Sequence, residues 1–203
     1  MLNDLNRIVR PSAVKLYTAP AAEPVTAAEA KSWFKQDSTA DDTLIGLLIT
    51  SIREKCEDYT RRAFINQTWD QCYDEEPAGI IELFRPPLSS VTSITSYNDA
   101  GTAAVFSSAS YIVDTNSAPG RVALKTGYSW PSDLRCINSI IFRFVAGYGS
   151  AGSAVPERVK QAIKIVMADL YANREGSMQA ALSSVAEANY ELPAYSKSLL
   201  SGL

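Results

Sequence analysis

The stretch Gly147-Tyr-Gly149-Ser-Ala-Gly152 has the G-x-G-x-x-G spacing with which many proteins bind phosphate groups. In such sites the glycines let the backbone approach the phosphate, and the N-terminus of the next helix supplies N–H donors. Here three more residues precede Pro156, which has no N–H, and Glu157 adds a negative charge where a pyrophosphate would sit. The sequence therefore favours a turn from strand to helix over a nucleotide site.

The other residues that could do chemistry give a weaker signal. Asp41 and Asp42 are adjacent and could bind a metal ion, but two acids at a helix start more often interact with the helix dipole. The chain has no histidine, which removes the commonest general base at neutral pH and the commonest zinc ligand. We therefore expect no catalytic residue, no metal and no cofactor. Cys56, Cys72 and Cys136 are widely separated, so we expect free thiols in a reducing compartment.

The composition is that of an ordinary globular chain, with 46% hydrophobic and 20% charged residues. The net charge of −3, with no cluster of Lys and Arg among aromatics, argues against direct DNA binding. We also expect neither a membrane span nor a signal peptide.

Three helices are predicted to form the frame that would position any site. A capping box of Thr26 and Glu29 opens a short first helix. A second helix runs from about Asp41 to Arg61, and a third from Val155 to Glu175 with Pro156 at its first position. The buried stripes are expected to contain Leu44, Leu48, Ile52, Cys56 and Tyr59 in the second helix, and Val159, Ile163, Val166, Met167 and Leu170 in the third.

Between these helices the hydrophobic period changes from 3.6 to 2. Alternation begins at Phe64 and runs to Tyr73, and short strands joined by turns follow. They are expected at residues 79–84, 91–97, 102–106, 111–114, 121–124 and 137–145. The predicted fold class is α+β, with a helical core (about 26–62 and 155–190) and an inserted antiparallel β region (about 64–146). An extended N-terminal arm (1–25) and a C-terminal tail (191–203) flank this single domain (26–190), in which 177–189 could form a further helix.

Several stretches, taken in their order along the chain, resemble those of a known family. They are Glu23-Pro24-Val25-Thr26 with Glu29-Ala30-Lys31, Asp41-Asp42 before Leu44–Ile52, Tyr59–Ile65 with Gln67-Thr68-Trp69, Leu83–Val91, Trp130-Pro131, Ala146–Gly149, Val155-Pro156-Glu157 with Lys160–Ile163, and Leu170–Glu175. Over roughly residues 20–200 this order resembles the head–tail connector (adaptor) proteins of long-tailed bacteriophages and prophages.

The resemblance implies a non-enzymatic structural protein of the virion neck, assembled in the host cytoplasm. Such adaptors form an oligomeric ring, a dodecamer in the virion, which docks under the portal protein and offers a platform to the stopper or tail-completion protein. DNA passes through the lumen without specific binding, and the acidic-to-neutral charge balance suits that role.

Two surfaces are candidates for the subunit or portal interface. On the third helix, Ile165, Ala168 and Ala172 form a second stripe that could receive another helix or another subunit, although alanine is also simply a good helix former. The tail has no obvious intramolecular cover for its apolar residues, and its candidate contacts are Leu192, Pro193, Tyr195, Leu199 and Leu200.

Two alternatives remain open. Within the same class, the chain could be another head-completion or tail-side structural protein. From a different class, it could be a small nucleotide-binding protein or enzyme that uses the Gly147–Gly152 loop.

Overall fold

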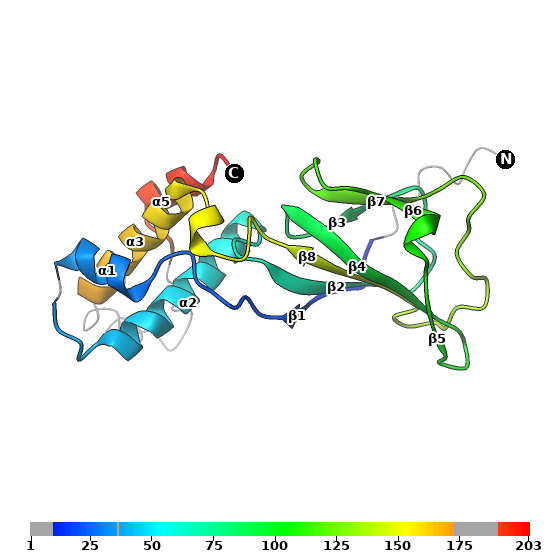
Figure 1. Cartoon of the computed structure of the whole chain (residues 1–203), viewed down its shortest axis with the longest axis horizontal. Coiled ribbons are helices and arrows are strands. Elements are labelled where there is room, and N and C mark those ends of the chain that lie inside the picture. The colour runs from blue at the N-terminus through cyan, green and yellow to red at the C-terminus, as the bar shows by residue number, and fades with distance from the viewer. Residues whose placement is uncertain (1–9, 36, 173–190) are drawn as a thin grey trace. The chain divides into compact units, whose positions relative to one another are not determined.

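The computed structural model describes residues 10–35, 37–172 and 191–203, and the structural statements below refer to these residues. The predicted α+β class is confirmed: helices and two antiparallel sheets make up the described chain (Figure 1). The chain divides into two compact units. The first, the β unit, contains the described residues up to Ala21 together with Arg61–Ser150. The second, the helical unit, contains the described residues of Ala22–Thr60 and of Ala151–Leu203.

The β unit contains two antiparallel sheets. The five-stranded sheet has the order β1-β2-β8-β4-β5, and the three-stranded sheet has the order β3-β7-β6 (Figure 1). The strands are β1 (Ala13–Thr18), β2 (Gln67–Tyr73), β3 (Ile80–Leu83), β4 (Leu88–Tyr97), β5 (Ala103–Val105), β6 (Tyr111–Asp114), β7 (Gly120–Leu124) and β8 (Ile140–Ala146). Every strand expected from the alternating pattern is therefore present.

A single apolar core lies between the two sheets. Along β8 the residues alternate strictly between buried and half-buried, so Ile140, Phe142 and Phe144 all point inward. Ile81 and Leu83 of the three-stranded sheet belong to the same buried cluster. The arrangement is a small sandwich, in which each sheet covers the apolar face of the other.

The helical unit is built around one central helix. Helix α3 (Glu157–Ala172) contacts α1 (Ala27–Phe34), α2 (Asp42–Thr60) and α5 (Ala194–Leu200) (Figure 1). Its buried residues include four of the five predicted, Val159, Ile163, Val166 and Met167, whereas Leu170 is half-buried. The predicted capping box of α1 is present: Glu29 N–H donates to Thr26 Oγ1 over 3.2 Å, and Thr26 N–H donates to Glu29 Oε2 over 2.7 Å.

The predicted buried stripe of α2 is confirmed only at Ile52 and Cys56. Leu44 and Tyr59 are exposed and Leu48 is half-buried, whereas Ile45 and Ile49 are buried instead. The physical reason is the run Leu44–Ile49, which is apolar apart from Gly46, so that two neighbouring stripes have nearly equal hydrophobicity. Contacts with α1 and α3 then decide which of the two is buried.

Both flanking segments contain regular structure. In the expected N-terminal arm, Ala13–Thr18 is extended and pairs with β2 as an edge strand of the five-stranded sheet. In the expected tail, α5 packs against α3. The further helix expected at residues 177–189 lies outside the described residues, as does the end of the third helix beyond Ala172.

Candidate functional site

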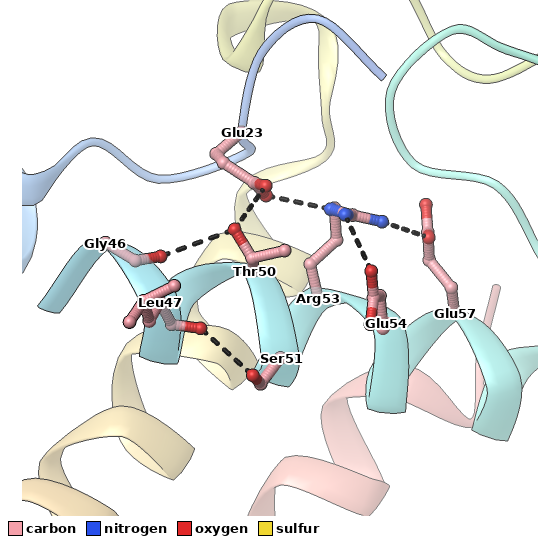
Figure 2. A network of polar contacts seen from close by, with 8 residues as sticks. All are labelled: Glu23, Gly46, Leu47, Thr50, Ser51, Arg53, Glu54 and Glu57. Atoms are coloured by element: carbon pink, nitrogen blue, oxygen red, sulfur yellow. Dashed lines mark hydrogen bonds and ion pairs between the residues drawn. The ribbon is translucent and has the colours of Figure 1, made fainter. Parts of the chain in front are cut away.

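A polar network within the described residues of the helical unit surrounds the side chain of Arg53 (Figure 2). Arg53 lies on α2, and its side chain is only 4% exposed. Its Nε donates to Glu23 Oε2 over 2.8 Å, and its Nη1 donates to Glu57 Oε2 over 2.7 Å. Burial alone would lower the pKa of Arg53, but Glu57 and Glu23 outweigh that effect and raise the pKa above its ordinary value. The guanidinium is therefore a permanent cation.

This network attaches the segment before α1 to the side of α2. Glu23 also accepts a hydrogen bond from Thr50 Oγ1 over 2.8 Å, so its carboxylate is held at both oxygens (Figure 2). A Cβ added to Gly152 would lie 2.8 Å from the carbonyl oxygens of Glu23 and Pro24. The ion network and this close backbone contact fix residues 23–25 from two directions. The arrangement is structural, because every group in it binds another part of the same unit.

The glycine motif does not form a phosphate loop. Gly147 has a φ of +144°, and a Cβ there would lie 2.5 Å from the backbone of Ile65 and Asn66. The N–H of Gly147 donates to the carbonyl of Pro87, and the N–H of Tyr148 donates to that of Phe64. These two amides are used within the chain, and the close approach of two backbone segments explains the first glycine. The structure contains the expected turn from strand to helix, between β8 and α3.

The acidic and cysteine side chains named from the sequence lie apart from one another in the part of the chain that the structure describes. Within it, no group of three or more Asp, Glu, Cys or His side chains is placed to hold a metal ion. Asp41 accepts a hydrogen bond from the Tyr171 hydroxyl over 2.7 Å, and Asp42 accepts one from Lys31 over the same distance. No helix among the described residues is long and apolar enough to cross a membrane. The three thiols are free, as expected, with Cys56 and Cys72 buried and Cys136 exposed.

The predicted interface residues of α3 lie on its outer side. Ala172 is exposed, and Ile165 and Ala168 are half-buried, whereas the residues on the opposite side of the helix are fully buried. The structure therefore brings these three side chains together on a surface, as their spacing predicted.

The predicted interface residues of the tail divide into two groups. Leu192 and Leu200 are 3% and 2% exposed, so the expectation that the apolar tail has no intramolecular cover is not met for them. Tyr195 is 64% exposed, and Pro193 and Leu199 are half-buried. The physical reason is that α5 is amphipathic and turns one side toward α3, where Ser196 Oγ donates to the carbonyl of Ala162 over 3.5 Å. Of the tail residues, Tyr195 presents the largest accessible apolar surface.

Two exposed apolar features were not predicted from the sequence. On α2, Leu47 is exposed together with Leu44. On the outward face of the three-stranded sheet, Ile80 and Ile112 both pair with Ala123 of the middle strand and form a cross-strand row. The alternation in β3, with Ile81 and Leu83 buried, is a signal that could have identified Ile80 as outward-facing.

Comparisons with known proteins give a likeness in structure but not in sequence. No protein-family model matches the chain, and no curated protein matches its sequence. A chain in a structure described as the neck of an empty GTA particle computed with C6 symmetry is 20% identical, with a TM-score of 0.73 over 94% of both chains. A chain in the virion of a native gene transfer agent (GTA) particle is 17% identical, with a TM-score of 0.70 over 93% of both. A third, in the neck of a native GTA particle computed with C12 symmetry, is 17% identical, with a TM-score of 0.64 over 94% of this chain and 93% of the other. These likenesses establish a shared fold over nearly the whole chain.

Proposed function

We propose that this chain is a structural subunit of the neck of a phage or phage-like particle. In its more specific form, the proposal is that it is a head–tail connector (adaptor), which assembles as a ring under the capsid portal and provides the platform for the stopper or tail. The helical core and the inserted β region act together as one connector subunit. The chain is made in the host cytoplasm and becomes part of the virion.

One observation carries this proposal. The fold matches chains from the necks of gene transfer agent particles with a TM-score of up to 0.73, and the match covers 94% of both chains. A match of this extent includes the β unit and the helical unit together, so it does not arise from one common motif. The order of segments in the sequence supports the same family independently of the fold. The C6 and C12 symmetries named for the GTA necks support a ring as the form of assembly.

The chemistry of the described residues agrees with a structural role. The network around Arg53 is internal, and the backbone amides of Gly147 and Tyr148 donate to carbonyl groups of the same chain. A net charge of −3 gives the ring no general attraction for DNA, which suits a lumen through which DNA moves.

The first experiment deletes the gene for this chain, so that particles assemble without it. We expect heads that package DNA but carry no tail, because a connector is required after packaging. Complementation with the wild-type chain restores complete particles and serves as the control. Complete, infectious particles in the absence of the chain would overturn the proposal. Isolated tails that contain the chain, with heads that lack it, would favour the alternative of a tail-side protein.

A second experiment measures the solution mass of the purified chain, alone and with the cognate portal, by light scattering. A closed ring on the portal is the expected result. A chain that ignores the portal but binds labelled nucleotide would revive the alternative of a nucleotide-binding protein.

A further inference from the structure

The outer side of α2 carries two large apolar side chains at one end and two acids at the other. Leu44 and Leu47 are 42% and 64% exposed. Glu54 and Asp58 follow on the same side of the helix, and both are exposed, although Glu54 Oε1 lies 3.4 Å from Arg53 Nη2 and the exposed Lys55 lies at the edge of this side. We call this surface the α2 outer face: Leu44, Leu47, Ser51, Glu54 and Asp58. It lies opposite the buried stripe that contains Ile45, Ile49 and Cys56.

The outer side of α3 has the complementary order of side chains. It begins with the exposed cation Arg158 and continues through Gln161 to Ile165, all at helical spacing. It ends with the small side chains of Ala168 and Ala172. We call this surface the α3 outer face: Arg158, Gln161, Ile165, Ala168 and Ala172. It lies opposite the buried stripe that contains Val159, Ile163 and Met167.

The two faces have equal length, because one runs from residue 44 to 58 and the other from 158 to 172. Each therefore extends about 21 Å along its helix axis. When the helices are placed antiparallel, Leu44 and Leu47 meet Ala172 and Ala168. Large side chains then meet small ones, which allows the close helix spacing of about 8–10 Å found in packed pairs. At the other end, Arg158 meets Asp58 and Glu54, so that opposite charges face each other.

Neither face complements itself in the same way. Two antiparallel α2 outer faces would place Leu44 of one copy against Asp58 of the other, and two parallel ones would place acid against acid. Two antiparallel α3 outer faces would bring Arg158 toward the exposed acid Asp169, but they would place the small side chains of Ala168 and Ala172 against Gln161 and Arg158, with no large apolar side chain to pack on them. The order of charges and side-chain sizes therefore selects contact between the two different faces.

We propose that the α2 outer face of one copy of this chain binds the α3 outer face of the next copy, with the helices antiparallel. The interface is heterologous, which is the kind that closes into a ring when repeated by rotation. On a single copy the residues of the α2 outer face are exposed, and those of the α3 outer face are exposed or half-buried. The inference rests on the proposed ring function and names its subunit contact.

The test is disulfide cross-linking in assembled particles. The exposed thiol is first removed by Cys136→Ser, since Cys56 and Cys72 are buried. Leu47→Cys and Ala168→Cys are then introduced together, and Leu44→Cys with Ala172→Cys forms a second pair. After mild oxidation, we expect a ladder of covalent multimers on a non-reducing gel for the double variants. The single variants carry a thiol on one face only and are expected to give no ladder.

A matched control pair combines Leu47→Cys with Ile112→Cys, since both positions are more than half exposed but Ile112 is on the three-stranded sheet. A ladder with this pair as strong as with the proposed pairs would overturn the inference. Complete particles in which neither proposed pair gives a ladder would also overturn it, while leaving the proposed neck function intact. Complete particles that do not contain the chain at all would overturn both.

Discussion

Gln71 of β2 donates a hydrogen bond from its amide nitrogen to the carbonyl oxygen of Glu82 in β3, over 2.8 Å. The two strands belong to different sheets. The Gln71 side chain is fully buried and also accepts a hydrogen bond from the N–H of Phe84 over 3.0 Å. One side chain thus satisfies backbone groups at the end of β3 and fastens the three-stranded sheet to the five-stranded sheet.

Gln71→Leu is expected to destabilise the chain by about 2–3 kcal/mol, because it leaves the carbonyl of Glu82 and the N–H of Phe84 without this partner. Urea denaturation followed by tryptophan fluorescence measures the change. Thr92→Val, at an exposed position of β4, is the control and should have little effect. An unchanged unfolding midpoint for Gln71→Leu would mean that these hydrogen bonds do not hold the sheets together.

Arg53→Met is expected to lower the free energy of unfolding by about 3–5 kcal/mol, because it removes the cation that binds the buried carboxylate of Glu57. The free energy of unfolding by urea measures this. Arg121→Met breaks the exposed ion pair with Asp114 and is the control, for which we expect almost no shift in the unfolding midpoint. Adding Glu57→Gln to Arg53→Met should recover part of the loss. Additive losses in the double variant would contradict direct coupling of the two side chains.

Cys56 gives a pH dependence of stability. Burial, with a smaller contribution from Glu57, raises the pKa of its thiol from 9.0 to about 12. The unfolded chain therefore loses this proton at lower pH than the folded chain, so the contribution of Cys56 is complete below pH 9 and is lost as the pH rises from 9 through 12. Thermal unfolding between pH 8 and 11 should show a steeper decline for the wild type than for Cys56→Ala. Parallel declines would contradict the burial of this thiol.

The three thiols should also differ in reactivity. At pH 8 in the native state, a thiol reagent is expected to modify Cys136 rapidly, whereas Cys56 and Cys72 react only after denaturation. Mass spectrometry of the modified peptides identifies each site. Rapid native modification of Cys72 would show that β2 opens in solution.

Gly147→Ala is expected to cost at least about 2–3 kcal/mol, because its Cβ would collide with the backbone of Ile65 and Asn66 at a positive φ. Gly101 has a φ of +81° in open space, so Gly101→Ala should cost only about 1 kcal/mol. Urea denaturation of both variants measures the difference. Equal costs would mean that the close backbone contact at Gly147 relaxes easily.

Substitutions of Tyr195 and Leu192 distinguish the role of the tail in binding the portal from its role in the stability of the fold. Leu192→Ala removes a buried side chain and should cost about 2–4 kcal/mol of stability. Tyr195→Ala removes an exposed one and should leave the melting temperature unchanged while weakening binding to the portal. Portal binding equal to that of the wild type would remove Tyr195 from the candidate interface. The two single substitutions are more informative than deletion of the tail, which would remove buried residues as well.

The sequence was sufficient for features that depend on local pattern. The Thr26–Glu29 capping box, the strands with strict alternation and the stripe of α3 were all predicted, because each needs only its own segment to be recognised. The choice of buried stripe in α2 depended on its partner helices, and the cover of Leu192 and Leu200 depended on a short helix at the end of the chain. The Arg53 network was not predicted, since Glu23 is distant from Arg53 in sequence and no spacing rule connects them.

The division of the helical unit into two stretches has a consequence for synthesis. A ribosome completes Arg61–Ser150 of the β unit before it makes any of α3. Helix α3 is the element that contacts the other helices of the helical unit. At that stage the β unit has all of its strands, but the stripe of Ile45, Ile49 and Ile52 on α2 lacks its largest neighbour. At this stage a nascent chain therefore has a complete β sandwich, whereas the apolar stripe of α2 is not yet covered by α3, and chaperones bind exposed apolar surfaces of this kind. Any product truncated before residue 151 keeps that surface permanently, so cellular quality control can remove it before it enters a particle.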